Sequence, residues 1–426
     1  MRLTFVQPAQ SHVKKKCLFC IEPPYVAKLY AMTPKDVTCN FFDDRIEKVN
    51  FDYPTDLVSI GINTINAKRG YDIAQEYRKR GVKVVIGGIH ASLIPEETEK
   101  YADVVMIGEG EDTWPQMIQD FKDGCLKKRY EAPCRHDMHG LKVDRSILEG
   151  KRYLPISHVE ATRGCYYHCN FCALAAIFKS KVTFRPIDEV IEDIKSLKTR
   201  IFSFTDDNVG DDLKYRKELF NRMIPLKKKW FGQITLKTLL DEEFVKLLHD
   251  SGCISIFTGF ETNNAEMLKQ MNKRSNVAIP DYQRAIDNCI KYDIPISAGA
   301  VVGYPGETKE TAKAVFDFVN SYQFFMCTIS NAMPYPGTPM YKEMKENGTL
   351  IEDWWMRDTD PYNSALCRIP NFTDEELANL GGKYFTDFLT YKNIFHRFWI
   401  SKHHLKTRWK ILLFNLFFKH CSWVVR

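Results

Sequence analysis

Residues 163–172 read Arg-Gly-Cys-Tyr-Tyr-His-Cys-Asn-Phe-Cys, and this stretch is the most informative of the chain because it places Cys165, Cys169 and Cys172 on one short loop. Three thiolates do not complete a structural zinc site, which takes four protein ligands. They can hold three irons of a cubane iron–sulfur cluster and leave the fourth iron open to a small molecule. The alternative is three buried thiols that bind nothing. The chain has 13 cysteines in all, so some of them are expected to lie close in sequence by chance. The spacing favours the cluster.

Strand and helix patterns alternate around this loop, from about residue 155 to 345. Helices are expected at 187–197, 212–228, 242–251, 280–292 and 309–322, and strands at 157–162, 201–205, 234–236, 254–258, 296–302 and 327–332. Six strands alternating with helices predict a partial (β/α)6 barrel, because a full eightfold barrel needs about 250 residues. In such a barrel the chemistry lies at the carboxyl ends of the strands.

Charged residues stand where two of these strands end. Asp206 and Asp207 are adjacent carboxylates that repel each other unless a cation neutralises them, although Asp207 could also cap a turn. Glu261 can accept hydrogen bonds from a ribose or an amine, or it can form an ion pair with Lys273 or Arg274. Glycines at strand ends, which admit close approach of a flat ring, are Gly259, Gly299 and Gly303.

The first 130 residues show a second alternation. Strands are expected at 3–6, 37–42, 57–62, 82–86 and 104–107, with helices at 67–80 and 95–101. This order predicts a Rossmann-like, doubly wound parallel sheet, whose ligands bind beyond the carboxyl ends of the strands. Gly87 and Gly88 follow one strand and Gly108 follows the next. Taken alone, this pattern indicates a nucleotide-sized ligand.

The cysteine loop, including Phe171 before the third cysteine, resembles that of the radical S-adenosylmethionine (SAM) superfamily. The residues at the strand ends follow the superfamily's order, with Asp-Asp-Asn in place of its Gly-Gly-Glu. The resemblance implies that the three cysteines bind a [4Fe–4S] cluster. It also implies that SAM chelates the open iron and is cleaved reductively to a 5′-deoxyadenosyl radical. The SAM contacts would be Asp206, Asp207, Gly259, Glu261, Gly299 and Gly303.

Residues 56–111 are similar to the N-terminal domain of cobalamin-type radical SAM proteins, in the hopanoid-enzyme and bacteriochlorophyll-cyclase branch. The resemblance implies that cobalamin contacts Thr64, Gly87, Gly88 and Gly108. The Asp-x-His-x-x-Gly motif that supplies a cobalt ligand in other B12 proteins is absent. We therefore expect no histidine on cobalt, and we expect His90 to be an ordinary loop residue.

The expected domains are a B12-binding-like domain (1–130), a connector (131–154), the barrel (155–345) and a C-terminal extension (346–426). The expected function is cobalamin-dependent C-methylation of an unactivated carbon by a radical SAM enzyme. One alternative is a rearrangement, cyclisation or 3-amino-3-carboxypropyl transfer in which the first domain uses no cobalamin. A non-enzymatic alternative is an iron–sulfur scaffold or a redox-sensing module.

The charge and the cysteine content of the chain limit which partners and which cellular location we expect. The net charge of +6 is too mild to indicate a nucleic acid partner. The expected partners are a small-molecule or lipid-like substrate and an external electron donor such as flavodoxin or ferredoxin. Without a signal-peptide pattern, the cysteines indicate reduced thiols and a cytoplasmic location.

The last 39 residues differ in character from the rest of the chain. From Phe388 to Arg426 there are eight Lys or Arg and no Asp or Glu, interleaved with aromatic and aliphatic residues. This pattern predicts a basic amphipathic helix pair. The pair could lie on the inner face of a membrane, or its aromatics could pack on the barrel while its bases face water.

Overall fold

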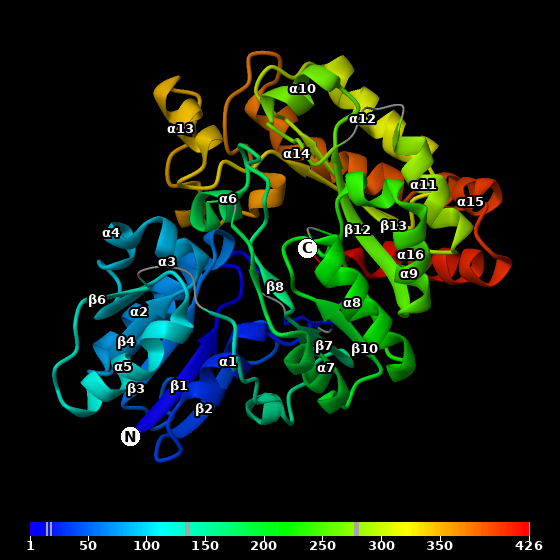
Figure 1. Cartoon of the computed structure of the whole chain (residues 1–426). Coiled ribbons are helices and arrows are strands. Elements are labelled where there is room, and N and C mark those ends of the chain that lie inside the picture. Colours follow the sequence, from blue (N-terminus) through cyan, green and yellow to red (C-terminus); the bar gives the residue numbers. More distant parts are fainter. Residues whose placement is uncertain are drawn as a thin grey trace. The chain divides into compact units, whose positions relative to one another are not determined.

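Two six-stranded sheets organise the chain (Figure 1). The computed structural model describes residues 1–13, 16–17, 19–132, 137–179, 181–210, 212–276 and 281–425, with side chains up to residue 420. The chain groups into two units. The first comprises Met1–His158, Thr183–Asp193 and Asp353–Thr359, and the second comprises Val159–Val182, Ile194–Glu352 and Asp360–Arg426.

The first unit contains a parallel sheet with the strand order β2-β1-β3-β4-β5-β6. Its inner strands are Val-, Ile- and Leu-rich and buried, as expected for a parallel sheet covered on both faces. This confirms the predicted doubly wound fold, although α1, α5 and β6 were not anticipated. The strands are β1 (Arg2–Gln7), β2 (Thr38–Asp43), β3 (Leu57–Gly61), β4 (Lys83–Gly87), β5 (Val104–Ile107) and β6 (Arg129–Glu131), and the helices are α1 (Pro24–Met32), α2 (Ala67–Lys79), α3 (Ile89–Leu93), α4 (Pro95–Thr98) and α5 (Gly110–Lys122).

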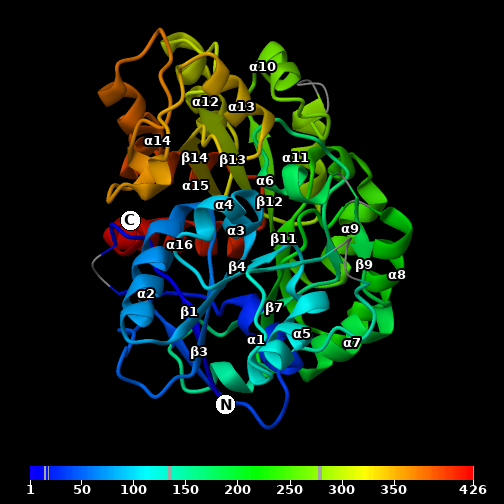
Figure 2. The same cartoon turned by 90° about the vertical axis from the view of Figure 1, so that its left-hand side faces the viewer.

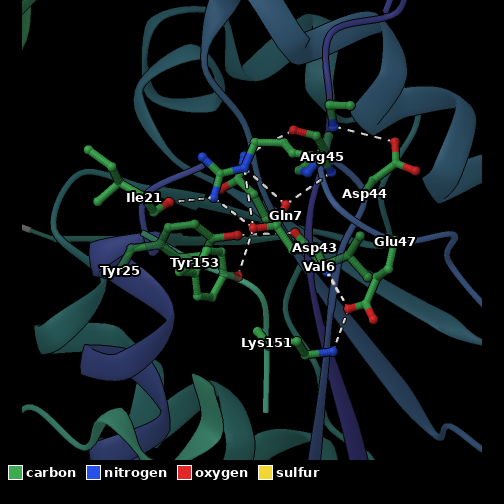
Figure 3. Close-up of polar contacts among 12 residues, drawn as sticks. Val6, Gln7, Ile21, Tyr25, Asp43, Asp44, Arg45, Glu47, Lys151 and Tyr153 are labelled. Carbon is green, nitrogen blue, oxygen red and sulfur yellow. Dashed lines mark hydrogen bonds and ion pairs between the residues drawn. The ribbon is translucent and has the colours of Figure 1, made fainter. Parts of the chain in front are cut away.

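Protein groups fill the carboxyl end of β2 (Figure 3). The fully buried Asp43 carboxylate accepts hydrogen bonds from Arg45 Nη2 at 2.6 Å and from the Tyr153 hydroxyl at 2.8 Å. The next carboxylate, Asp44, pairs with Arg69 Nε at 2.8 Å. The contact of Tyr153 with Asp43 holds residues 151–153 against β2. Because protein groups already neutralise the charges at this end of β2, the ends of β3, β4 and β5 are better placed to take a ligand.

The second sheet has the strand order β14-β13-β12-β11-β10-β7. Neighbouring strands from β10 to β14 pair in parallel, and helices α8, α9, α11 and α12 lie along the outer side (Figures 1 and 2). This confirms the predicted partial barrel. The strands are β7 (Ile156–Val159), β10 (Ile201–Phe204), β11 (Lys229–Gln233), β12 (Cys253–Glu261), β13 (Ile296–Val302) and β14 (Met326–Asn331).

The remaining elements of this region are short strands β8 (Thr162–Arg163) and β9 (Thr183–Phe184) and helices α6 (Ala173–Phe178), α7 (Ile187–Ser196), α8 (Leu213–Met223), α9 (Glu242–Asp250), α10 (Ala265–Gln270), α11 (Asp281–Lys291) and α12 (Lys309–Ser321). Residue 280, the predicted start of α11, lies outside the described residues. The predicted strand at 234–236 is wrong. The strand is β11, where Trp230 is fully buried and stacks on Phe220 with ring centroids 5.0 Å apart.

Four helices complete the second unit: α13 (Pro339–Glu346), α14 (Asp374–Phe388), α15 (Tyr391–Ile400) and α16 (Leu405–Val425). The Asn331 side chain at the end of β14 donates to Leu377 O at 2.8 Å and accepts from Gly381 N at 3.0 Å, which fixes α14 on the sheet. Helices α15 and α16 form the predicted C-terminal pair and pack against each other (Figure 1, red). In the part of the chain that the structure describes, no helix is long and apolar enough to cross a membrane.

Candidate functional site

The cysteine loop joins β8 to α6. Cys169 is buried, while Cys165 and Cys172 are half-buried, and none of the three forms a disulfide. Burial raises the pKa of Cys169 to about 11 and also raises the pKa of Cys172. The Cys169 and Cys172 thiols are therefore protonated at neutral pH, and metal binding would release their protons. Three cysteine thiols on one loop fit a cubane cluster, which takes one thiolate on each of three irons.

Hydrogen bonds to the backbone hold the middle of this loop in place. Asn170 N donates to Met271 O at 2.9 Å, and Asn272 Nδ2 donates to His168 O at 2.8 Å. On another side, Met340 N donates to Asn170 O at 3.1 Å. The segment after α10 and the start of α13 thus fix where the three thiols lie. Within the described ranges, no three His, Cys, Asp or Glu side chains are grouped closely enough to hold a single metal ion.

Asp206 and Asp207 have different environments. The fully buried Asp206 carboxylate accepts from the backbone N–H groups of Ala161 and Thr162, the Thr162 hydroxyl and Arg216 Nη2, at 2.6–2.9 Å. Four donors leave it little capacity for a ligand, so it ties the first two barrel strands together at their ends. Its predicted contact with SAM stays a prediction.

Asp207 faces the cysteine loop. Its carboxylate accepts a hydrogen bond from Gly164 N at 2.7 Å, at the residue that precedes Cys165. Burial, reinforced by the neighbouring charge of Asp206, raises the pKa of Asp207 to about 6. A buried carboxylate of this kind can accept a cationic group such as an ammonium, which would lower its pKa again. The geometry is compatible with the predicted SAM contact, which stays a prediction.

Glu261 forms the ion pair with Lys273 that the sequence left open as an alternative. Lys273 Nζ lies 2.6 Å from Glu261 Oε1, and both side chains are largely buried. Glu261 ends β12 with a left-handed backbone (φ 62°), where the pairing with β13 shifts register. A Cβ at Gly259 would clash with the Glu261 carboxylate and lie 3.1 Å from Lys273 Nζ. Gly259 therefore makes room for the ion pair.

The glycines in β13 and directly after it also have partners within the protein. A Cβ at Gly299 would lie 2.7 Å from the Phe257 ring, and Gly303 has a left-handed φ of 70°. Gly303 N donates to the Glu307 carboxylate, and burial raises the pKa of Glu307 to about 7. Sequence reasoning gave Glu307 no role because it falls one position late for the superfamily motif. It braces the turn after β13.

In the first unit, His90 is fully buried and both of its ring nitrogens are engaged. Nδ1 lies 3.2 Å from Thr64 Oγ1, and Nε2 lies 3.2 Å from Glu97 Oε1. Trp355 Nε1 also donates to Glu97 Oε1, at 3.0 Å. The prediction that His90 is an ordinary loop residue is wrong, because the residue lies in α3 and its buried ring is committed to an internal network. That no histidine binds cobalt stays a prediction. Thr64, a predicted cobalamin contact, belongs to the same network.

The three predicted glycines at the ends of β4 and β5 differ in what requires them. Gly88 (φ 104°) and Gly108 (φ 81°) have left-handed backbones, and a Cβ at Gly88 would clash with Ile62 O. A Cβ at Gly87 would only touch Met106 Cβ at 3.4 Å, and its φ is not left-handed. The protein's own packing therefore does not demand glycine at position 87, which fits a ligand lying against this strand end. The cobalamin contacts of these residues stay predictions.

Comparison with known proteins addresses the family directly. The sequence pattern described as "Radical SAM superfamily" matches residues 159–319, and that of the "B12 binding domain" matches residues 31–118. Bacteriochlorophyllide d C-12(1)-methyltransferase of Chlorobaculum tepidum is 31% identical over 340 residues, which cover 77% of this chain and 74% of that protein. Hopanoid C-2 methylase of Rhodopseudomonas palustris is 22% identical over 78% of this chain and 66% of that protein.

Among solved structures, the radical SAM methyltransferase TsrM from Kitasatospora setae, with cobalamin and a [4Fe–4S] cluster bound, has the same fold. The TM-score is 0.66 at 19% identity, over 81% of this chain and 78% of that one. These findings confirm the predicted fold class, the prediction of an enzyme, and the three cofactors that its family uses: a [4Fe–4S] cluster, SAM and cobalamin. The chain belongs to the radical SAM superfamily and carries a B12 binding domain ahead of its radical SAM domain.

Proposed function

We propose that this chain is a cobalamin-dependent methyltransferase that methylates an unactivated carbon of a small-molecule or lipid-like substrate. The observation that carries the proposal is a three-cysteine loop and a B12 binding domain in one chain, with 31% identity to a methyltransferase over three quarters of both sequences. When bound, the cofactors supply the electron for SAM cleavage, the radical that abstracts hydrogen, and the methyl carrier.

The protein's own residues have distinct roles in this proposal. Cys165, Cys169 and Cys172 hold the cluster, and Asp207 orients the start of their loop through Gly164 N. Glu261, held by Lys273, presents a fixed carboxylate at the end of β12. The substrate is not specified by these residues, because pockets vary freely on one fold.

The test is anaerobic purification with cobalamin, followed by reaction with methyl-labelled SAM under dithionite. We expect a cobalamin spectrum, and both 5′-deoxyadenosine and S-adenosylhomocysteine once a substrate is supplied. A variant with Cys165, Cys169 and Cys172 all replaced by alanine should lose the cluster chromophore and SAM cleavage. The matched control is Cys289→Ala, a thiol buried in α11 and outside this loop, which should keep both.

The outcomes separate the alternatives. SAM cleavage without retained cobalamin would favour a rearrangement, cyclisation or 3-amino-3-carboxypropyl transfer. An intact cluster without SAM cleavage would favour an iron–sulfur scaffold or redox sensor. The proposed partner for reduction is an external one-electron donor of the flavodoxin or ferredoxin class, which should replace dithionite in the assay.

We also propose that the C-terminal pair lies on an anionic membrane surface. One face of the pair anchors it to the barrel. Arg397 donates to Phe388 O at 2.9 Å and to Asn415 Oδ1 at 3.0 Å, and Asn415 Nδ2 donates to Phe325 O at 2.8 Å. Part of the tail thus packs on the barrel, but through the buried base Arg397, whereas the packing alternative placed the bases in water.

A second face of the pair stays exposed. It carries Trp399, which is 73% exposed, and Trp409, which is 50% exposed. Spacings of four residues keep its members on one side of each helix, Tyr391, Phe395 and Trp399 on α15 and Leu405, Trp409, Leu413 and Phe417 on α16. Exposed lysines accompany it at 392, 402, 406 and 410, without an acidic residue after Asp387. An apolar ridge with cationic flanks matches an anionic lipid surface.

Flotation of the full chain with phosphatidylcholine vesicles, with and without phosphatidylglycerol, tests this contact. We expect flotation only with the anionic lipid, weakened by salt, and strongly reduced by Trp399→Glu with Trp409→Glu. Ile224→Glu, at an exposed apolar residue outside the tail, should float like the unmodified protein. If the tryptophan variant instead floats equally well, or changes only the oligomeric state, the exposed face is not a membrane contact.

A further inference from the structure

Lys273 is a buried cation beside the cysteine loop. Its side chain is 12% exposed, and its Nζ lies 5.7 Å from the ring centroid of Phe171, the residue between Cys169 and Cys172. The hydrogen bonds that Met271 O accepts from Asn170 N and that Asn272 Nδ2 donates to His168 O hold the segment that carries Lys273. The distance between this ammonium and the loop is therefore built into the fold.

The ammonium of Lys273 lies over a residue of the cysteine loop, and its carboxylate partner is close by. Lys273 Nζ faces the ring of Phe171, and Glu261 Oε1 lies 2.6 Å from the same nitrogen. Both side chains are largely buried, so solvent screens their charges little. A buried cation beside the loop favours negative charge on it, and the carboxylate opposes this effect.

A cubane held by three thiolates becomes more negative by one charge when it takes up one electron from an external donor. Its potential depends on net charge and surroundings, and a nearby cation in a buried site favours the reduced form. We propose that Lys273 is a positioning residue that raises the reduction potential of the cluster held by Cys165, Cys169 and Cys172, and that Glu261 limits this effect. The inference rests on the cluster of the proposed function and not on methyl transfer.

The test is a redox titration of the reconstituted full chain, followed by electron paramagnetic resonance without SAM or cobalamin. Lys273→Met should lower the equilibrium constant for one-electron reduction about tenfold, which corresponds to about 59 mV. Glu261→Gln should shift the potential the other way, and Lys273→Arg should keep it. The matched control is Lys291→Met, because Lys291 pairs with Glu242 at the same 2.6 Å but is 58% exposed. This control variant should leave the reduction potential unchanged.

Opposite shifts of the reduction potential in the two variants indicate an electrostatic effect, because a disturbed loop would shift the potential of both variants in the same direction. Shifts of the same sign in Lys273→Met and Glu261→Gln, or no shift in either, would overturn the proposal. If Lys273→Met takes up no cluster, Glu261→Gln decides: a raised potential supports the role of Lys273 and an unchanged one refutes it. Methyl transfer can fail in other assays without affecting this readout.

Discussion

Asp206→Asn tests whether the carboxylate at the end of β10 is structural. Arg216 and Asp206 are both fully buried, and the pair is 2.6 Å apart. Two guanidinium nitrogens of Arg216, Nε and Nη1, have no hydrogen-bond partner among the described residues. The Asp206 carboxylate is thus the ionic partner of a wholly buried cation. Asparagine would remove that charge and turn an N–H group toward the donors of Thr162 or Ala161.

The expected cost follows from this geometry. Removing one partner of a buried ion pair costs about 3–5 kcal/mol, because the other charge is left uncompensated. For a unit of this size about 1 kcal/mol shifts the melting temperature by roughly 2–4 °C, so the second unit should melt roughly 6–20 °C lower. Asp206→Asn combined with Arg216→Met should cost less than Asp206→Asn alone, since no charge then stays buried without a partner.

Thermal unfolding of the cluster-free protein measures this, because neither SAM nor metal then contributes. The matched control is Asp250→Asn, which removes the carboxylate of an exposed pair with Lys246 at 2.5 Å and should leave the midpoint unchanged. If Asp206→Asn melts like the control, the reasoning is refuted. Asp206 would then be free to serve SAM, as the sequence first predicted.

Three further predictions concern single positions. His90→Ala should leave the spectrum of bound cobalamin unchanged while lowering stability, because the histidine is buried between Thr64 and Glu97; a changed cobalt coordination would contradict this. Gly87→Val should weaken cobalamin retention without a large loss of stability, and equal retention would show that no ligand lies there. Burial raises the pKa of Asp207 from an ordinary 3.8 to about 6, so the folded state disfavours the ionised carboxylate. The stability of the protein should therefore decline as the pH rises between these two values. Urea unfolding of cluster-free Asp207→Asn should lack this part of the decline, and an unaltered pH profile would count against it.

Local patterns predicted most of the fold, and their failures have physical causes. Apolar β-branched runs located β1, β3, β5 and β13 because parallel strands are buried on both faces. β11 was misplaced because Lys229-Trp-Phe-Gly-Gln233 is not a continuous apolar run, and tertiary packing of Trp230 decides its state. Helix α5 escaped notice because it begins at Gly110 and contains Pro115, both of which are unfavourable in a helix.

The sequence predicted where the candidate site lies better than it predicted which protein side chains pair with one another there. Glu261 and Lys273 were matched because they are close in sequence and opposite in charge. The partner of Asp206 was missed, since nothing in the pattern shows that Arg216 on α8 turns inward with no exposed surface. Two adjacent carboxylates therefore suggested a bound cation, whereas the cation of one of them belongs to the protein.

The glycines at the strand ends show why composition alone exaggerates a ligand site. Gly259 is required by an ion pair, Gly88 by the backbone of Ile62, and Gly303 by its left-handed conformation. Each would be glycine whether or not a cofactor binds, so none of them is by itself evidence of one. Gly87 is stronger evidence of a ligand because the protein's own atoms leave room for a Cβ there. A strand-end glycine indicates a ligand only where neither packing nor backbone geometry already requires glycine.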